Sequence, residues 1–267
     1  MTRRLLLAAS LATLALATAG AASALTMATF NECASASPAL GIADQIDGTG
    51  GDAIGAGSGA PYNLDRTDDA VVCVDQHDPF GSVDTAAEFT NELANTGSHE
   101  LGHLLGLEHE DGNAGSLMDG SFSGTDKGFS DANELAVLNV QPLLVQVVFL
   151  DFNLSSTELT FPNPYAPFAQ AAVLAQYGIA GAAAIQAVVN AIVAQITADY
   201  AGPWTSGTTY EFYTSEADAL NAALVANGNL DYSTVIFLAL PEPGPALLLL
   251  AAGALFARRV GDSRRRS

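Results

Sequence analysis

The chain has 267 residues, which is enough for one large domain or for two small ones. Of these residues 49% are hydrophobic, enough to form a buried core. Its formal net charge is −20, and between positions 25 and 240 the only basic residues are Arg66 and Lys127. A body this negative repels nucleic acid and anionic membrane surfaces, which excludes nucleic acid as a partner.

The N-terminus has the features of a secretory signal peptide. Two arginines at positions 3 and 4 precede an apolar run over 5–19, and Ala22-Ser23-Ala24 is typical of a cleavage site. We expect residues 1–24 to be removed and the mature chain to be exported. The ordinary secretory route is favoured over the twin-arginine route, which the two arginines also suggest.

The chain has two cysteines, Cys33 and Cys73, and the predicted export determines their expected oxidation state. An exported chain folds in an oxidising compartment, so the pair is predicted to form a disulfide. The alternative is that Cys33 blocks a metal site and keeps an enzyme inactive, but "NECASASP" around it resembles no known latency motif.

Before the main motif, residues 41–47 and 70–76 are predicted to be strands by their alternation and composition, with a glycine-rich loop at 48–61 between them. His77 follows the second strand and has Asp75 and Asp78 as neighbours. One interpretation is a second metal site, and the favoured one is a solvated turn.

The segment "HELGHLLGLEH", residues 99–109, contains three of the four histidines. Apolar residues at helical intervals predict a helix over 87–105. On that helix His99 and His103 are four residues apart, so their rings project from one face and can bind one metal ion. Glu100 lies between them and can act as a base toward water at the metal.

Gly106 is predicted to end this helix, because glycine accepts the left-handed turn that stops it. The chain then turns back, and His109 can supply a third nitrogen. Three protein ligands leave a fourth position open, which distinguishes a catalytic zinc site from a closed structural one.

The complete pattern resembles the H-E-x-x-H-x-x-G-x-x-H motif of the metzincin metallopeptidases, and every fixed position matches. Met118 in "SLMDG" is similar to the Met-turn beneath the zinc ligands of that clan, and its short distance from His109 most resembles the matrixin branch and its bacterial relatives. The alternatives are a structural zinc site and an inactive copy of the fold that serves as a surface or extracellular matrix binding protein.

The resemblance implies a zinc-dependent endopeptidase that hydrolyses a protein or peptide substrate, with Glu100 as general base and Met118 in a packing role. It implies an α+β fold in which a mixed sheet carries a long helix and the zinc-binding helix. Calcium is a further cofactor that matrixins often bind.

After the motif, Ser130 is predicted to cap a helix through "DANELAVLNV". Strands are predicted at 145–152, 208–214 and 233–240, and an alanine-rich helix at 168–200 that has no charged residue between Ala169 and Ala198. That helix could also span a membrane, but its Gln and Asn residues are costly in lipid, so we expect it to cover the sheet.

These later elements are the ones that a metzincin has before its zinc helix. We therefore predict a circularly permuted domain with its seam near Pro142, in which strand 146–152 lies between 208–214 and 233–240. Strand 233–240 should also neighbour strand 70–76, and both long helices should pack on one face. The alternative divides the chain into a catalytic part, 25–142, and a second small domain, 143–240.

The C-terminal segment, residues 241–267, has a Pro-Glu-Pro triplet, an apolar stretch at 246–257 and a terminal cluster of arginines. It resembles the PEP-CTERM sorting tails of Gram-negative bacteria, which implies membrane retention and processing by an exosortase-type enzyme. An ordinary anchor is the alternative, although the apolar stretch is shorter than the roughly 20 residues of a bilayer span. The chain is thus expected in the cell envelope or outside the cell.

Overall fold

The computed structural model describes residues 41–43, 69–77, 85–107, 109, 112–119, 124–129, 145–157, 165–202 and 207–240. The strands are β1 (Gly41–Ala43), β2 (Asp69–Cys73), β3 (Val145–Asp151), β4 (Ala166–Pro167), β5 (Thr209–Tyr213) and β6 (Ser233–Ala239). The helices are α3 (Ala86–Leu104), α5 (Ala182–Asp199) and α6 (Glu216–Asn227), with three short 3-10 helices, η1 (Val74–Gln76), η2 (Phe168–Gln170) and η3 (Ala172–Tyr177).

One sheet joins the two halves of the chain. Its order is β1-β2-β6-β3-β5, and the short β4 also pairs with β6. The pairs β2–β6, β6–β3 and β3–β5 are parallel, whereas β1 is antiparallel to β2. The predicted neighbours of β3 and of β6 are therefore confirmed. The sheet is mixed, as expected, but it is mostly parallel with helices between its strands, so the fold is α/β in class where α+β was expected.

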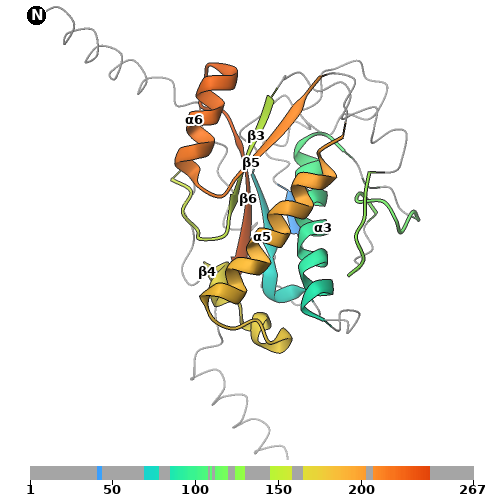
Figure 1. The fold of residues 1–267 in the computed structure, drawn as a ribbon. Coiled ribbons are helices and arrows are strands. Elements are labelled where there is room, and N and C mark those ends of the chain that lie inside the picture. Colours follow the sequence, from blue (N-terminus) through green and yellow to red (C-terminus); the bar gives the residue numbers. More distant parts are fainter. Residues whose placement is uncertain are drawn as a thin grey trace, which may run out of the picture.

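Helices cover both faces of this sheet (Figure 1). Helices α3 and α5 pack side by side on one face, over a core that includes Val72, Val148 and Phe237. This confirms that the two long helices share a face. Helix α6 packs on the opposite face against Val147 and Phe149. With both faces covered, the central strands β3 and β6 are almost entirely buried, and for that reason they appear in the sequence as continuous apolar runs.

Close approach of the layers depends on small residues. A Cβ at Gly97 of α3 would lie 3.0 Å from Ile196 of α5 and 3.0 Å from Phe237 of β6. Gly97 therefore lets α3 approach both its neighbouring helix and the sheet. Helix α5 is long and apolar enough to cross a membrane by length and composition alone. Its buried residues, Val188, Val189, Ile192 and Ile196, belong to the core, as expected of a helix that covers a sheet.

Two boundaries and one helix differ from the prediction. The helix expected over 168–200 begins at Ala182, because Gly178 and Gly181 both have positive φ angles, which interrupt a helix, and the chain before them forms η2 and η3. The strand expected at 70–76 ends at Cys73 and continues as η1. Helix α6 was not predicted. The signal peptide, the helix after Ser130 and the sorting tail lie outside the described residues.

Candidate metal centre

The helix that carries the motif is defined at both ends by local chemistry. At its start the Thr85 hydroxyl accepts the Glu88 amide at 3.2 Å and donates to the Glu88 carboxylate at 2.9 Å, which resembles a capping box. At its end Gly106 has φ 91°, and the amides of Gly106 and Leu107 donate to the carbonyls of His103 and Gly102 at 2.9 Å. This is a Schellman turn, and it reverses the chain as predicted.

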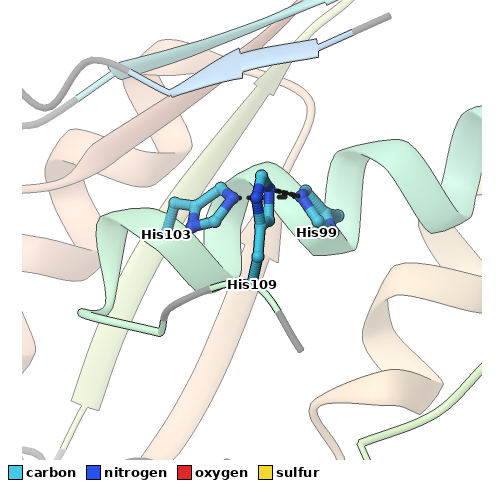
Figure 2. Close-up of side chains that lie close together, drawn as sticks. All are labelled: His99, His103 and His109. Atoms are coloured by element: carbon cyan, nitrogen blue, oxygen red, sulfur yellow. Dashed lines mark hydrogen bonds between the residues drawn. The ribbon is translucent and has the colours of Figure 1, made fainter. Parts of the chain in front are cut away.

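The reversal brings the three histidines together. The Nε2 atoms of His99 and His103 are 3.0 Å apart, and those of His99 and His109 are 3.1 Å apart. Figure 2 shows the three rings directed at a common point, two from α3 and one from the chain that follows it. Among the described residues, this is the one group of histidine, cysteine or acidic side chains whose ligand atoms are arranged to hold a metal ion.

Backbone carbonyls orient two of these rings. Nδ1 of His99 lies 2.6 Å from the Leu117 carbonyl, and Nδ1 of His103 lies 2.7 Å from the Leu107 carbonyl. A carbonyl only accepts hydrogen bonds, so Nδ1 of each ring must carry the proton. In the neutral rings Nε2 then presents a lone pair, which is the form that binds a metal.

Burial keeps these rings neutral. It lowers the pKa of His99 to about 3, with a further reduction from the neighbouring His103, and it lowers the pKa of His103 to about 4. Neutral nitrogens that face each other with lone pairs at 3.0 Å repel unless a cation lies between them. The donor set therefore fits a metal ion better than it fits a hydrogen-bonded cluster.

The spacing also fits zinc. Tetrahedral zinc with Zn–N bonds of about 2.05 Å separates two nitrogen ligands by about 3.3 Å, within a few tenths of an ångström of the observed distances. His99 is buried whereas His109 is exposed, so the triad is reached from the side of His109. Three protein nitrogens leave the fourth position of a tetrahedral zinc for a further ligand.

The other two residues of the motif, Glu100 and Met118, are both buried. Glu100 follows His99 on α3 and is 4% exposed. Met118 is fully buried, and its sulfur would lie 2.6 Å from a Cβ at Gly102, so it packs against the helical turn that bears His103. This contact is possible because position 102 has no side chain.

The loop beneath the triad contains a buried lysine whose role the sequence did not indicate. Lys127 Nζ lies 3.5 Å from the Asp119 carbonyl and 4.0 Å from its carboxylate. Asp119 also accepts the Gly112 amide at 3.0 Å, and the Lys127 amide donates to Asn95 of α3 at 3.3 Å. Burial lowers the pKa of Lys127, whereas Asp119 raises it. The one available signal was that Lys127 is one of two basic residues in the acidic body.

His77 lies outside this centre, and it is not solvated. It is 1% exposed, with Nδ1 3.0 Å from the Cys73 carbonyl and Nε2 2.9 Å from the Thr96 hydroxyl. Both ring nitrogens are thus occupied, so the favoured interpretation of a solvated turn was wrong. The alternative of a metal site is not supported either, because the Asp75 carboxylate accepts the amides of Val173 and Leu240, and Asp78 lies outside the described residues.

Cys73 is fully buried at the end of β2 and is disulfide-bonded. Its predicted partner, Cys33, lies outside the described residues, so the pairing stays a prediction.

Comparison of the chain with family models, with curated proteins and with solved structures found no match. What is established for this site is a triad of histidines, His99, His103 and His109, that could hold a metal ion.

Proposed function

We propose that the chain is a zinc-dependent endopeptidase of the metzincin type. The observation that carries the proposal is the convergence of three histidine Nε2 atoms, two of which are aimed by hydrogen bonds from Nδ1 to backbone carbonyls. The motif adds the acidic residue, Glu100, that hydrolysis requires and that a purely structural metal site does not.

The residues around the triad have separate roles in this proposal. His99, His103 and His109 would hold a zinc ion, whose Lewis acidity would lower the pKa of a water molecule and polarise the scissile carbonyl. Glu100 accepts the proton of the attacking water and later passes it to the leaving amine. The carbonyls of Leu107 and Leu117 hold His103 and His99 in the tautomer that binds metal. Met118 supports the helical turn from below, without a chemical role.

The experiment that tests the proposal separates metal binding from hydrolysis. We expect the purified mature chain to contain one zinc ion by mass spectrometry and to cleave casein until a chelator is added. Glu100→Gln should retain the zinc and lose between about 100-fold and 10,000-fold in rate, because the general base is gone. Thr85→Ser, a change at the N-terminus of the same helix that keeps the capping hydroxyl, is the matched control and should retain activity.

Two results would count against this function. Full activity in Glu100→Gln would show that Glu100 is not the base. Zinc at full occupancy without cleavage of casein or of a peptide library would favour a metal-holding binding protein.

We also propose that the mature chain is exported and held at the cell envelope by residues 241–267, which an exosortase-type enzyme processes. The support is the sequence of the tail alone. Deletion of those residues should release the protein into the soluble fraction, and unchanged fractionation with membranes would place retention elsewhere. Calcium binding stays a prediction.

A further inference from the structure

The topology of the sheet creates a crevice at the end opposite to the histidines. Strands β3 and β5 are adjacent and parallel, but the helices that follow them lie on opposite faces, α5 on one and α6 on the other. Figure 1 shows α5 and α6 on either side of these strands. In open α/β sheets, ligands bind in the crevice that forms where neighbouring strands send their chains to opposite faces, beyond the carboxyl ends of the strands.

A cavity of about 380 Å³ lies at this position. Phe152 and Asn153 line it from the end of β3, Thr214 from the end of β5, and Phe168, Gln186 and Val189 from η2 and α5. Its volume is within the range of small-molecule sites, which begins at roughly 300 Å³.

The lining has a definite chemistry. Phe152, Phe168 and Val189 form buried apolar walls, and the rings of Phe152 and Phe168 meet edge to face at 5.5 Å. Asn153, Gln186 and Thr214 are exposed polar groups, so they lie toward the mouth. None of the described residues that line the cavity is charged, although the chain has a net charge of −20. A ligand with an apolar body and one uncharged, hydrogen-bonding end would match these lining residues.

The rim of the cavity is held in one conformation. The Asp151 carboxylate, which is fully buried, accepts the amides of Asn153, Ser155 and Ser156 at 2.9, 2.7 and 2.9 Å. Within this loop Leu154 has φ 54°, a left-handed backbone that costs energy for a residue with a side chain. The loop that presents Asn153 is thus pre-organised, which reduces the entropy lost when a ligand binds.

We propose that this cavity binds a small uncharged molecule that has an aromatic or branched aliphatic body and one hydrogen-bonding end. The site is separate from the histidine triad, which lies toward the C-terminal end of α3, so its occupation requires no metal. The inference does not depend on peptidase activity.

The test uses the mature chain and three probes of similar shape: benzamide, which is neutral, benzoate, which is an anion, and benzylamine, which is a cation. Binding is followed by ligand-observed NMR titration. We expect saturable binding of benzamide and binding at least roughly 10-fold weaker for both charged probes, because none of the described residues that line the cavity has a charge to compensate that of the probe.

Two matched substitutions locate the binding. Ala182 lines the cavity and Ala198 does not, and both are exposed alanines of α5. We expect Ala182→Phe to weaken benzamide binding by at least roughly 10-fold by filling the mouth, and Ala198→Phe to leave it unchanged. Should Ala182→Phe fail to fold by circular dichroism, Ala169→Phe takes its place, because Ala169 also lines the cavity and lies outside α5.

Three outcomes would overturn the proposal: no saturable binding of benzamide up to its solubility, equal binding of the charged probes, or undiminished binding in the variant with a filled cavity. His103→Ala distinguishes this site from the triad. It should leave benzamide binding intact whether or not the chain proves to be a zinc enzyme.

Discussion

The protein buries histidine in two different ways, and the contrast shows what identifies a metal ligand. His77, His99 and His103 each have a pKa lowered mainly by burial, and each places Nδ1 against a backbone carbonyl. They differ at Nε2, which meets the Thr96 hydroxyl in His77 but the nitrogens of other imidazoles in the triad. Burial and a shifted pKa are therefore shared by a structural histidine and by candidate ligands. The convergence of unoccupied lone pairs is what separates them.

The two environments also differ in which parts of the fold they join. His77 connects the end of β2 to the middle of α3 through Cys73 and Thr96, so it links the sheet to a helix. His99 and His103 connect α3 only to the turns that follow it, through Leu117 and Leu107. Loss of His77 should accordingly weaken the fold, whereas loss of a triad member should weaken metal binding.

The largest expected effect comes from removing a member of the triad. His103→Ala deletes one of three protein ligands, so zinc affinity should fall by more than about 100-fold, beyond the loss typical when only an outer-shell partner is removed. Competition with a chromophoric chelator measures the affinity. His77→Gln, the matched change at the structural histidine, should retain the affinity of the original chain. Zinc binding that depends on His77 and not on His103 would reverse the assignment.

The next effect is a pH dependence that belongs to His77. Its pKa is about 4 in the folded chain, and an unfolded histidine has the ordinary value of 6.5. The unfolded state therefore takes up a proton first as the pH falls, so stability is complete above pH 6.5, declines toward pH 4 and then levels off.

Between pH 7 and pH 5 this difference amounts to about 2 kcal/mol of unfolding free energy. Urea denaturation of metal-free protein at the two pH values should show that the original chain loses about that much more than His77→Gln does. The triad is identical in both proteins and cancels in the comparison. Equal losses would mean that His77 is protonated in the folded chain or already exposed.

Much of the triad could be predicted from the sequence because its ligands are local. His99 and His103 are separated by one helical turn, and Gly106 marks the end of that helix, so the spacing predicts that the three rings meet. The orientation of the His99 ring was not predictable, because it depends on the Leu117 carbonyl, 18 positions away. The burial of His77 could not be predicted, because it depends on Thr96, a residue 19 positions away on an element that packs only in the folded state. Lys127 was missed for the same reason, since its partners lie on α3 and in the turn at Asp119.

The elements of the fold also differ in how well the sequence predicts them. The strands β3 and β6 were predicted because burial on both faces leaves long apolar runs. Helix α6 was missed because apolar residues occur around its whole circumference and only Ala219 and Ala223 are buried, so its sequence has no clear helical period. Ser215 before it and the left-handed Gly228 after it were the usable signals. In the segment before α5, Gly178 and Gly181 were signals that the helix begins only after them, but the alanine-rich composition of the whole segment led to the prediction of one long helix.

A smaller effect is expected from the support beneath the triad. A Cβ at Gly102 would lie 2.6 Å from the Met118 sulfur and 3.2 Å from Leu107. Met118 directly follows Leu117, and the carbonyls of Leu117 and Leu107 orient the rings of His99 and His103. Gly102→Ala should therefore lower zinc affinity by about 10-fold, the lower end of the loss that follows disturbance of outer-shell partners. Gly115→Ala is the matched control, because a Cβ there meets only Asn113, at an ordinary 3.8 Å. Equal affinities in both variants would show that Met118 does not position the ligands.

The smallest effect is expected from removing one hydroxyl, that of Thr96, which lies against His77 and not against the triad. The Thr96 hydroxyl lies 2.9 Å from Nε2 of His77 and 2.9 Å from the Glu92 carbonyl, and it has one proton to donate. Because Nδ1 of His77 donates to a carbonyl, Nε2 of the neutral ring is an acceptor, so the hydroxyl proton is assigned to the ring. Thr96→Val keeps the shape of the side chain but leaves that buried nitrogen without its donor, which should cost about 1 kcal/mol of unfolding free energy. Thr90→Val is the matched control, because the Thr90 hydroxyl donates only to the Ala86 carbonyl, which also accepts the helical amide of Thr90 itself. Urea denaturation should detect the difference while zinc affinity stays constant in both variants. A fall in zinc affinity in Thr96→Val would mean that the two histidine environments are coupled through α3 and that His77 belongs to the metal centre after all.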